Sequence, residues 1–385
     1  MIKKIALVRG DGAAPEMMEQ ATRVVSHAAA QLDGMAIHWV ETPMGWTAYE
    51  KFGDTTPPES MKTALELGLV FFGGVGDPAM DLTVGKKNKA MMPEPRSLLA
   101  LRKGMGLLLN FRPMVLMREL GHLSPLKLEL IPEEGVEMVF IRFLLEDSYF
   151  GLQDLLPRIP DNVEWNLGMK LKEDVTGEEK MITELAYYRG ETVRKYFRAA
   201  FEYARVKKLP LISIDKANVM SRYAYWRMIA TEIGKEFPDV PLRHQYVDSA
   251  CMQLFHPHLL RGVIACGNEH GDILSDGAAE MVGGMGLMHS SAINPDTGHA
   301  MFESGAGTAP TLAGQNKANP LGRILTGAML LRHIGALRGA SAIEESVRKV
   351  LKSGYRTPDI AEAACDKNKI VTCSGMGERV LEGIS

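Results

Sequence analysis

Two aspartates in the segment GDILSD, Asp272 and Asp276, have a spacing that suits a metal ion. Residues four apart on a helix share one face, and two carboxylates there repel each other unless a cation lies between them. Hard cations such as Mg²⁺ and Mn²⁺ prefer oxygen ligands, often carboxylates together with substrate and water. The alternative is that Asp272 caps a helix and Asp276 is a solvated surface residue. Asp248, in YVDSA, is a candidate third carboxylate, although sequence alone does not bring it near the other two.

Three arginines lie within apolar segments: Arg102 and Arg112 in LLALRKGMGLLLNFRPM, and Arg142 in VFIRFLL. A guanidinium is costly to bury unless an anion pairs with it, and it can hold a carboxylate through two parallel hydrogen bonds. An internal salt bridge would explain any one of these arginines. All three together favour a site that binds carboxylates.

Lys216 and Tyr149 are candidates for proton transfer. Lys216, in IDKANV, follows the apolar run LPLISI and would act as a general base if burial favoured its neutral form. Tyr149, in SYFG, would act as a general acid. Each residue alone is equally well explained as a hydrogen-bonded structural group. Together with the arginines and aspartates, they indicate a small dicarboxylic acid bound through a metal.

The elements that would position these groups alternate between strand and helix. Residues 2–8 predict a strand that GDG interrupts, and Pro15 suits the first turn of the following helix. Residues 70–72 predict a buried strand stopped by GGVGDP. This alternation predicts an α/β fold with helices on both faces of the sheet and with ligands at the carboxyl ends of the strands.

Three further patterns predict local structure. Residues 169–188 read as a hairpin around Thr176-Gly177. Ser341 and Glu344 have the spacing of a capping box and predict a helix start there. The segment GAGTAPTLAGQNKANP, residues 305–320, leads into an apolar helical pattern at 321–337. Composition allows that segment to be either a plain connection or a loop that holds a phosphate-bearing cofactor.

Composition excludes several functional classes. The net charge of −3 and the absence of a basic run argue against nucleic-acid binding. No apolar run reaches the length of a membrane span or of a secretory signal, so we expect a soluble cytoplasmic protein. The four cysteines are scattered and form no zinc motif.

The motifs, taken in order, resemble the isocitrate/isopropylmalate dehydrogenase family, the β-decarboxylating dehydrogenases of 2-hydroxy acids. LLALR and LSPLK resemble the isopropylmalate branch most. The matching segments run almost end to end: GDG, FFGGVGDP, LLALRKGMGLLLNFRP, LSPLK, YFG, IDKANV, YVDSACMQL, GDILSD, GTAP, AGQNKANP and GYRTPDI.

The resemblance implies a two-domain fold with mixed sheets flanked by helices. Residues 1–107 and 283–385 would form a discontinuous cofactor-side domain. Residues 108–282 would form the substrate, metal and dimerisation domain, with a hairpin arm near 165–190 that clasps a second subunit. In this family the equivalents of Lys216 and Asp248 serve the neighbouring active site, which implies a homodimer.

The resemblance also implies roles for the residues singled out above. The substrate, a substituted malate, would be oxidised and decarboxylated with NAD or NADP as hydride acceptor. Tyr149 would protonate the enol and Lys216 would take the hydroxyl proton. The substrate carboxylates would be held by Arg102, Arg112 and Arg142, and Leu98 would offer an apolar wall to an alkyl group. The ligands of Mg²⁺ or Mn²⁺ would be Asp248, Asp272 and Asp276. The cofactor would contact Glu303, Gly307, Thr308, Ala309 and Asn319.

Departures from the family pattern leave other functions open. Glu146-Asp147 replaces a glycine pair beside the substrate, and would either repel a carboxylate or recognise a different substituent. Ala306 and Thr311 stand where the family has a histidine and, in NAD-dependent members, an acid that hold the adenosine. The alternatives are a D-malate, tartrate or other unusual diacid dehydrogenase, or a non-catalytic regulatory paralogue that has lost normal NAD binding.

Overall fold

Ten strands form a single mixed sheet in the part of the chain that the structure describes, with the order β2-β1-β3-β10-β9-β4-β5-β8-β6-β7. This computed structural model describes all residues except 1, 128, 130, 132–135, 151–185 and 385. The strands are β1 (Ile2–Val8), β2 (Ala36–Glu41), β3 (Leu69–Phe72), β4 (Leu109–Leu116), β5 (Val136–Phe143), β6 (Leu211–Asp215), β7 (Leu242–Tyr246), β8 (Gly262–Cys266), β9 (His289–Ile293) and β10 (Ala300–Ser304).

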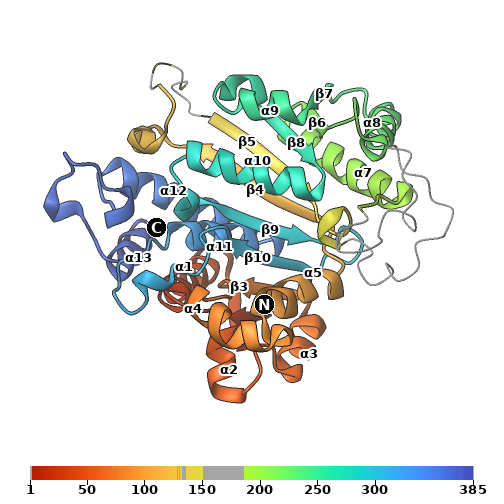
Figure 1. The fold of residues 1–385 in the computed structure, drawn as a ribbon. Coiled ribbons are helices and arrows are strands. Elements are labelled where there is room, and N and C mark those ends of the chain that lie inside the picture. Colours follow the sequence, from red (N-terminus) through yellow and green to blue (C-terminus); the bar gives the residue numbers. More distant parts are fainter. Residues whose placement is uncertain (1, 128, 130, 132–135, 151–185, 385) are drawn as a thin grey trace, which may run out of the picture.

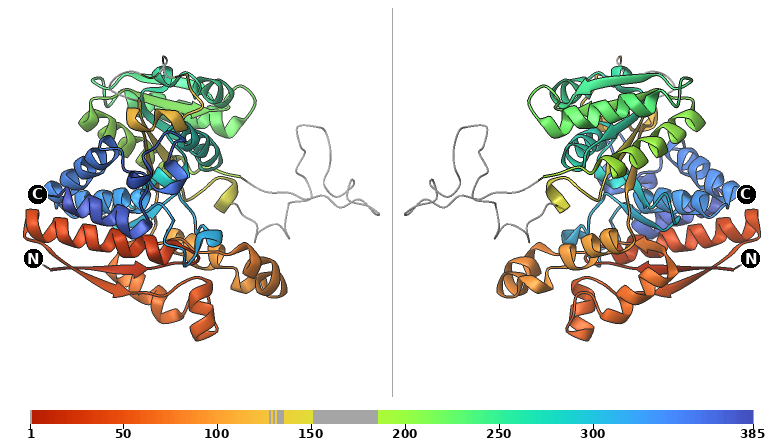
Figure 2. Two further views of the ribbon diagram at one scale, coloured as in Figure 1. Left: turned by 90° about the vertical axis from the view of Figure 1, so that its left-hand side faces the viewer. Right: turned by 90° about the vertical axis from the view of Figure 1, so that its right-hand side faces the viewer.

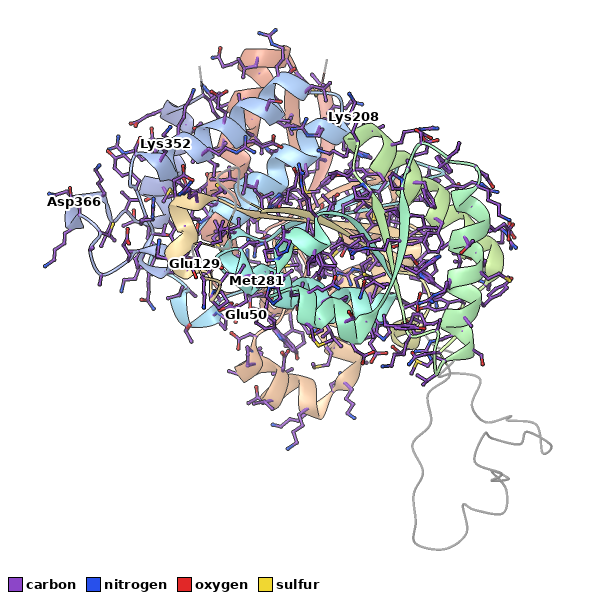
Figure 3. All side chains as sticks on the ribbon, turned by 90° about the horizontal axis from the view of Figure 1, so that it is seen from above. Glu50, Glu129, Lys208, Met281, Lys352 and Asp366 are labelled. Carbon is purple, nitrogen blue, oxygen red and sulfur yellow. The ribbon has the colours of Figure 1, made fainter. Side chains whose placement is uncertain are left out.

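Helices cover both faces of this sheet, so the predicted α/β fold is confirmed (Figure 1). The main helices are α1 (Ala14–Asp33), α2 (Trp46–Phe52), α3 (Pro58–Leu67), α4 (Pro78–Met80), α5 (Ala100–Gly104), α7 (Gly190–Lys207), α8 (Ser221–Gly234), α9 (Val247–Gln253), α10 (Asn268–Met281), α11 (Leu321–His333), α12 (Leu337–Lys352) and α13 (Cys373–Glu382). In Figure 3 the C-terminal ends of α7, α10 and α12 can be found at the labels Lys208, Met281 and Lys352.

The sheet order separates the chain into two groups of strands. β2, β1, β3, β10 and β9 come from residues before 108 or after 282, and the other strands come from 108–282. The two groups meet where β9 pairs antiparallel with β4. Figure 2 shows the N-terminal elements in red and orange at one end of the molecule and the green and teal elements at the other. The division into two domains at these boundaries stays a prediction.

Alternation along the strands decides which helices each face meets. In β1, Ile5 and Leu7 belong to the core built with α1, α11, α12 and α13, whereas Ala6 and Val8 belong to the core on the opposite face, with α3 and α5. Successive side chains of a strand point to opposite faces. A fully apolar strand such as IALV is therefore what a sheet covered on both sides requires.

The same alternation organises the second half of the sheet. In β5, Val139, Ile141 and Phe143 pack with α7 and α8, while Met138 and Phe140 lie in the core that contains α9 and α10. In α7, Val193, Phe197, Phe201 and Ala204 recur at helical spacing, and all four are buried against the sheet.

Two local predictions about the C-terminal helices are wrong. The pattern at 321–337 forms two helices, because α11 ends at His333 and Gly335 adopts a φ of 86° before α12 begins. Ser341 lies inside α12, which begins at Leu337. The carboxylate of Asp33 accepts hydrogen bonds from the first-turn N–H groups of Arg338 and Gly339, at 3.2 and 2.7 Å. A side chain from α1 therefore caps this helix.

The predicted hairpin arm near 165–190 falls mostly on residues 151–185, which lie outside the part of the chain that the structure describes. Of the helices that the structure does describe, none combines the length and apolar character needed to cross a membrane.

Candidate active site

A cavity of about 480 Å³ lies between the two groups of strands, and most of the predicted site residues line it. Its volume is in the range that small-molecule sites occupy. The lining includes Glu94, Leu99, Met288, Ser290, Ser304 and Gly305. The predicted site residues in the lining are Leu98, Arg102, Arg112, Arg142, Tyr149, Asp272, Asp276, Glu303 and Gly307.

The pleat of two neighbouring strands aims Arg112 and Arg142 at this cavity. On β5, Arg142 continues the face of Met138 and Phe140, which packs toward α10. β4 pairs antiparallel with β5, and Asn110 stands opposite Arg142. Arg112 lies two residues beyond Asn110 and therefore faces the same side. Both guanidinium groups are buried, with 9 % of Arg112 and 2 % of Arg142 exposed.

Helix α10 places both aspartates of GDILSD against these arginines. Arg112 Nη1 lies 3.1 Å from one carboxylate oxygen each of Asp272 and Asp276, and Arg142 donates to Asp272. The predicted shared helix face is confirmed. Asp272 does not cap the helix, which begins at Asn268. The internal salt bridges considered for Arg112 and Arg142 are therefore present.

The two aspartates have opposite pKa shifts. Burial alone would raise the pKa of Asp272, but the positive charges of Arg142 and Arg112 outweigh it and lower that pKa. Burial raises the pKa of Asp276, and Arg112 offsets this only in part while Asp272 adds to it. Burial, with repulsion from Arg112, lowers the pKa of Arg142 to about 9. The cavity thus holds closely opposed charges, of which the two guanidinium groups are the most shielded from water.

Tyr149 reaches into the cavity from the short turn after β5. Its hydroxyl donates to Asp272 at 3.0 Å, and the Arg142 guanidinium lies 5.1 Å from the centre of its ring. Burial and the charge of Asp272 raise the pKa of Tyr149. A phenol that stays protonated at neutral pH can donate a proton to a reacting carbon, as the predicted role requires.

Arg102 and Glu303 form an ion pair at the opposite wall of the cavity, with 3.3 Å between Nη2 and Oε2. Arg102 is buried on α5, and Glu303 follows Met301 on the face of β10 that packs toward α5. Leu98, also buried, comes from a π-helical segment, Glu94–Leu99, that leads into α5.

Lys216 and Asp248 are not part of this cavity. Lys216 follows β6 directly, and its ammonium group donates to the carboxylate of Asp248. Neither residue lines the cavity, and the described residues contain no group of three or more His, Cys, Asp or Glu side chains that could hold a metal. One chain therefore brings together Asp272 and Asp276 but not the third predicted ligand.

Glu146 and Asp147 face the protein interior. Both are fully buried and neither lines the cavity, so the expected direct contact with a substrate substituent does not occur in this geometry. Glu146 accepts hydrogen bonds from the N–H and Nε of Arg189 at 2.7 and 2.6 Å. Asp147 accepts one from the Tyr188 hydroxyl at 2.6 Å and has a φ of 74°, a conformation suited to glycine.

The family model of isocitrate/isopropylmalate dehydrogenase matches residues 4–380. The chain belongs to this family. It is 39% identical over 379 residues to the 3-isopropylmalate dehydrogenase of Chromobacterium violaceum, covering 98% of this chain and 99% of that protein. It is 38% identical over 382 residues to the enzyme of that name from Neisseria meningitidis serogroup A, with 99% of both chains covered.

Solved structures agree with the family assignment. The isocitrate dehydrogenase of Methylococcus capsulatus has a TM-score of 0.78 at 28% identity, with 99% of both chains covered. A β-decarboxylating dehydrogenase from Thermococcus kodakarensis, solved in its apo form, has a TM-score of 0.74 at 26% identity, covering 99% of this chain and 96% of that one. This member of the family is therefore an oxidoreductase of the β-decarboxylating dehydrogenase type.

The predicted cofactor loop of this dehydrogenase is joined to the loops that follow β1 and β3. Ala13 N–H donates to the carbonyl of Thr308 at 2.8 Å, and the Thr308 hydroxyl donates to the carbonyl of Gly76 at 2.9 Å. The Asp11 carboxylate connects the same loops, because it accepts hydrogen bonds from the N–H groups of Trp46 and Gly76 at 2.9 and 2.8 Å. Three loops at the carboxyl edge of the sheet thus form one unit.

Asn319, predicted to contact the cofactor, has a structural role in this conformation. Its Oδ1 accepts from the N–H of Leu321 at 3.0 Å and so caps α11, while its amide donates to Asp359 at 3.2 Å. Only 5 % of the residue is exposed. Ala306 and Thr311 offer no side-chain hydrogen bond within the described part of the loop.

Sequence reasoning missed Asn268, which orients Arg142. Its Oδ1 accepts from Arg142 Nε at 2.9 Å, and its amide donates to the carbonyls of Leu144 and Glu146 at 2.8 and 3.0 Å. Asn268 thereby links a cavity arginine to the turn that carries Tyr149. The spacing in the sequence could have indicated this role, because Asn268 lies four residues before Asp272 and shares its helix face.

Proposed function

We propose that this chain catalyses the metal-dependent oxidative decarboxylation of a substituted malate-type 2-hydroxy diacid, most like 3-isopropylmalate, with NAD or NADP as hydride acceptor. The observation that carries the proposal is the convergence of three arginines, two aspartates and Tyr149 on one cavity. A buried guanidinium cluster recognises a dianionic substrate through bidentate hydrogen bonds. The apolar side chains of Leu98 and Leu99 give that cavity one wall for an alkyl substituent.

Substrate binding would exchange ion-pair partners inside the cavity. Arg112 and Arg142 contact Asp272, and Arg102 contacts Glu303. Carboxylates of the diacid would take over these arginines and release Asp272. Because the pairs are largely shielded from water, this exchange replaces one set of strong charge-assisted hydrogen bonds with another.

Asp272 and Asp276 fit a divalent cation. Both carboxylates line the cavity from one face of α10, and their mutual repulsion contributes to the raised pKa of Asp276. Mg²⁺ and Mn²⁺ accept such oxygen ligands together with substrate oxygens. A cation bound there supplies Lewis-acid stabilisation of negative charge on the substrate oxygen during oxidation and loss of CO₂.

Two residues would move the protons. Tyr149 would donate its phenolic proton to the carbon that loses CO₂, consistent with its raised pKa. Lys216 would accept the substrate hydroxyl proton in the cavity of a second protomer, and Asp248 would contribute the third carboxylate there. We therefore propose a homodimer with active sites shared between subunits. The expected cytoplasmic location stays a prediction.

The experiment is a screen of 2-hydroxy diacids with Mn²⁺ and with each nicotinamide, in which the reduced cofactor is measured by its absorbance. We expect turnover with a 3-alkylmalate. D-Malate and tartrate are included because the side group is the least determined feature of the substrate. Turnover with no diacid in the screen would contradict the proposal.

The nicotinamide is tested separately, because Ala306 and Thr311 stand where the family pattern has a histidine and an acid that hold the adenosine. A titration with NAD and NADP, in the presence of substrate and Mn²⁺, measures this binding directly. Absence of binding of both nicotinamides at millimolar concentration would contradict the proposed hydride acceptor.

A further inference from the structure

Arg323 is a buried cation in an apolar helix. It lies in the first turn of α11 and only 1 % of it is exposed. Its Nη2 donates to the carbonyl of Gly307 at 2.6 Å. Its Nε and Nη1 have no hydrogen-bond partner among the described residues, and none of the described carboxylates lies within ion-pair distance. A buried guanidinium with two unused donors is costly unless an anion compensates it.

This guanidinium lies beneath the three joined loops at the carboxyl edge of the sheet. β1, β3 and β10 are parallel neighbours, so the loops after them meet at one edge. A side-chain carbon added at Gly74 would lie 3.6 Å from both Arg323 Nη2 and the carbonyl oxygen of Gly307. The N–H of Asp11 donates to the carbonyl of Gly74 at 3.1 Å. Arg323 therefore supports the unit formed by all three loops.

The hydrogen bond to Gly307 also decides how the loop presents its amides. A trans peptide points its carbonyl and its N–H in opposite directions. With the carbonyl of Gly307 held inward by Arg323, the N–H of Thr308 must point outward. None of the amide N–H groups of Gly307, Thr308 and Ala309 donates to another described residue. Gly307 is exposed and lines the cavity, and consecutive free amides of this kind bind anions.

We propose that Arg323 is a positioning residue and buried counter-charge for the diphosphate of a nucleotide that binds on the outer side of loop 305–310. This inference rests on the proposed function and assigns the source of cofactor affinity within it. The loop offers alanine at 306 and a neutral threonine at 311, so its side chains add no charge. The attraction for phosphate would come from outward amides and from the cation behind them.

The charge of Arg323 persists at neutral pH. Burial lowers the pKa of Arg323 to about 10, and the negative charge of Glu303 opposes that change. Glu303 is already paired with Arg102, so it compensates Arg323 only at a distance. An anion held by the loop amides would offset the remaining cost of the buried charge.

The test measures binding rather than turnover. Isothermal titration with ADP, NAD and adenosine would be applied to the full-length wild-type protein and to Arg323→Gln, Arg323→Met and Arg323→Lys. We expect Arg323→Gln and Arg323→Met to weaken ADP and NAD binding about tenfold or more, with adenosine nearly unchanged. Arg323→Lys keeps the charge and should recover most of the affinity. The matched control is Arg332→Gln on the same helix, whose exposed guanidinium pairs with Glu344 at 2.7 Å.

A purely structural role for Arg323 would give different results. It would weaken adenosine as much as ADP and lower the thermal midpoint of Arg323→Met, whereas we expect that midpoint to hold or rise because an unpaired buried charge is removed. A second measurement needs no variant: ADP, but not adenosine, should slow hydrogen exchange at the amides of residues 307–309.

Two outcomes overturn the inference and remain distinguishable. If wild type binds ADP and all Arg323 variants bind it equally well, Arg323 is not the counter-charge and the proposed function stands. If wild type binds neither ADP nor NAD, the nicotinamide assignment itself fails and this inference fails with it.

Discussion

Lys216 and Asp248 are paired with each other on one protomer, and neither lines the cavity that holds Tyr149. Asp248 is exposed, so its carboxylate is free to face a second molecule. The proposed general base and the proposed third metal ligand therefore lie outside the cavity of their own chain, as an active site shared between two subunits requires. This relationship leads to the most direct test of the proposed dimer.

Mixing two inactive variants should restore activity. Tyr149→Phe disables the cavity of its own protomer, and Lys216→Ala disables the cavity of its partner. In a mixed dimer, one site then carries both defects and the other carries none. Random mixing of equal amounts should recover about a quarter of wild-type activity, because half of the dimers are mixed and each has one intact site. No recovery after subunit exchange, verified by native mass spectrometry, would contradict shared sites.

Asp272→Asn should weaken Mn²⁺ binding and remove turnover. The variant loses a carboxylate that faces the cavity and leaves Arg142 without its ion-pair partner. We expect Mn²⁺ affinity, measured by electron paramagnetic resonance, to fall about tenfold or more. The matched control, Asp296→Asn, removes an exposed carboxylate paired with Lys195 and should bind Mn²⁺ normally. An unchanged metal requirement in Asp272→Asn would remove this residue from the metal site.

Glu146→Ala should destabilise the protein strongly. The change leaves the N–H of Arg189 without its acceptor and opens a space where a fully buried side chain had been. We expect the free energy of unfolding, measured in urea, to fall by about 3 kcal/mol. Glu232→Ala is the comparison, because it breaks an exposed pair with Arg194 and should change little. Equal effects of the two variants would mean that Glu146 contributes no more than a surface charge.

His289 should make stability depend on pH. Burial favours the neutral ring and lowers the pKa of His289, although its hydrogen bond to the carbonyl of Leu287 acts in the opposite direction. Below the ordinary histidine value of about 6.5, the unfolded chain takes up a proton that the folded chain still rejects. The contribution of His289 to stability is therefore present above about pH 6.5 and is lost as the pH falls toward the pKa of His289 in the folded protein.

The check is urea unfolding at pH 7.5 and 5.5. His289→Asn keeps a donor near the carbonyl of Leu287 but cannot titrate, so it should lose less stability on acidification than wild type. His38→Asn, at an exposed position of β2, should lose as much as wild type. If His289→Asn and wild type lose the same amount, the His289 ring is not responsible.

Local spacing was sufficient to predict the parts of the site that depend on direction within one element. The interval of four between Asp272 and Asp276 holds wherever the helix packs, because the period of the helix sets it. The alternation of β4 and β5 likewise commits Arg112 and Arg142 to one face. Leu98 and Tyr149 also line the cavity, as predicted from the motifs that contain them.

Only the tertiary structure decided which buried charges and helix-terminal N–H groups have hydrogen-bond or ion-pair partners, because those partners are distant in sequence. Asp33 caps a helix that begins 304 residues later, and no motif near Leu337 predicts this contact. Glu146 turns inward because Arg189 offers two donors there, although its replacement of a glycine suggested a place beside the substrate. Arg323 lies in an apolar helix whose pattern predicted only burial. Whether the Arg323 guanidinium has a partner depends on the loops that follow three different strands. These loops are distant in sequence, so the residues next to Arg323 do not predict the contact.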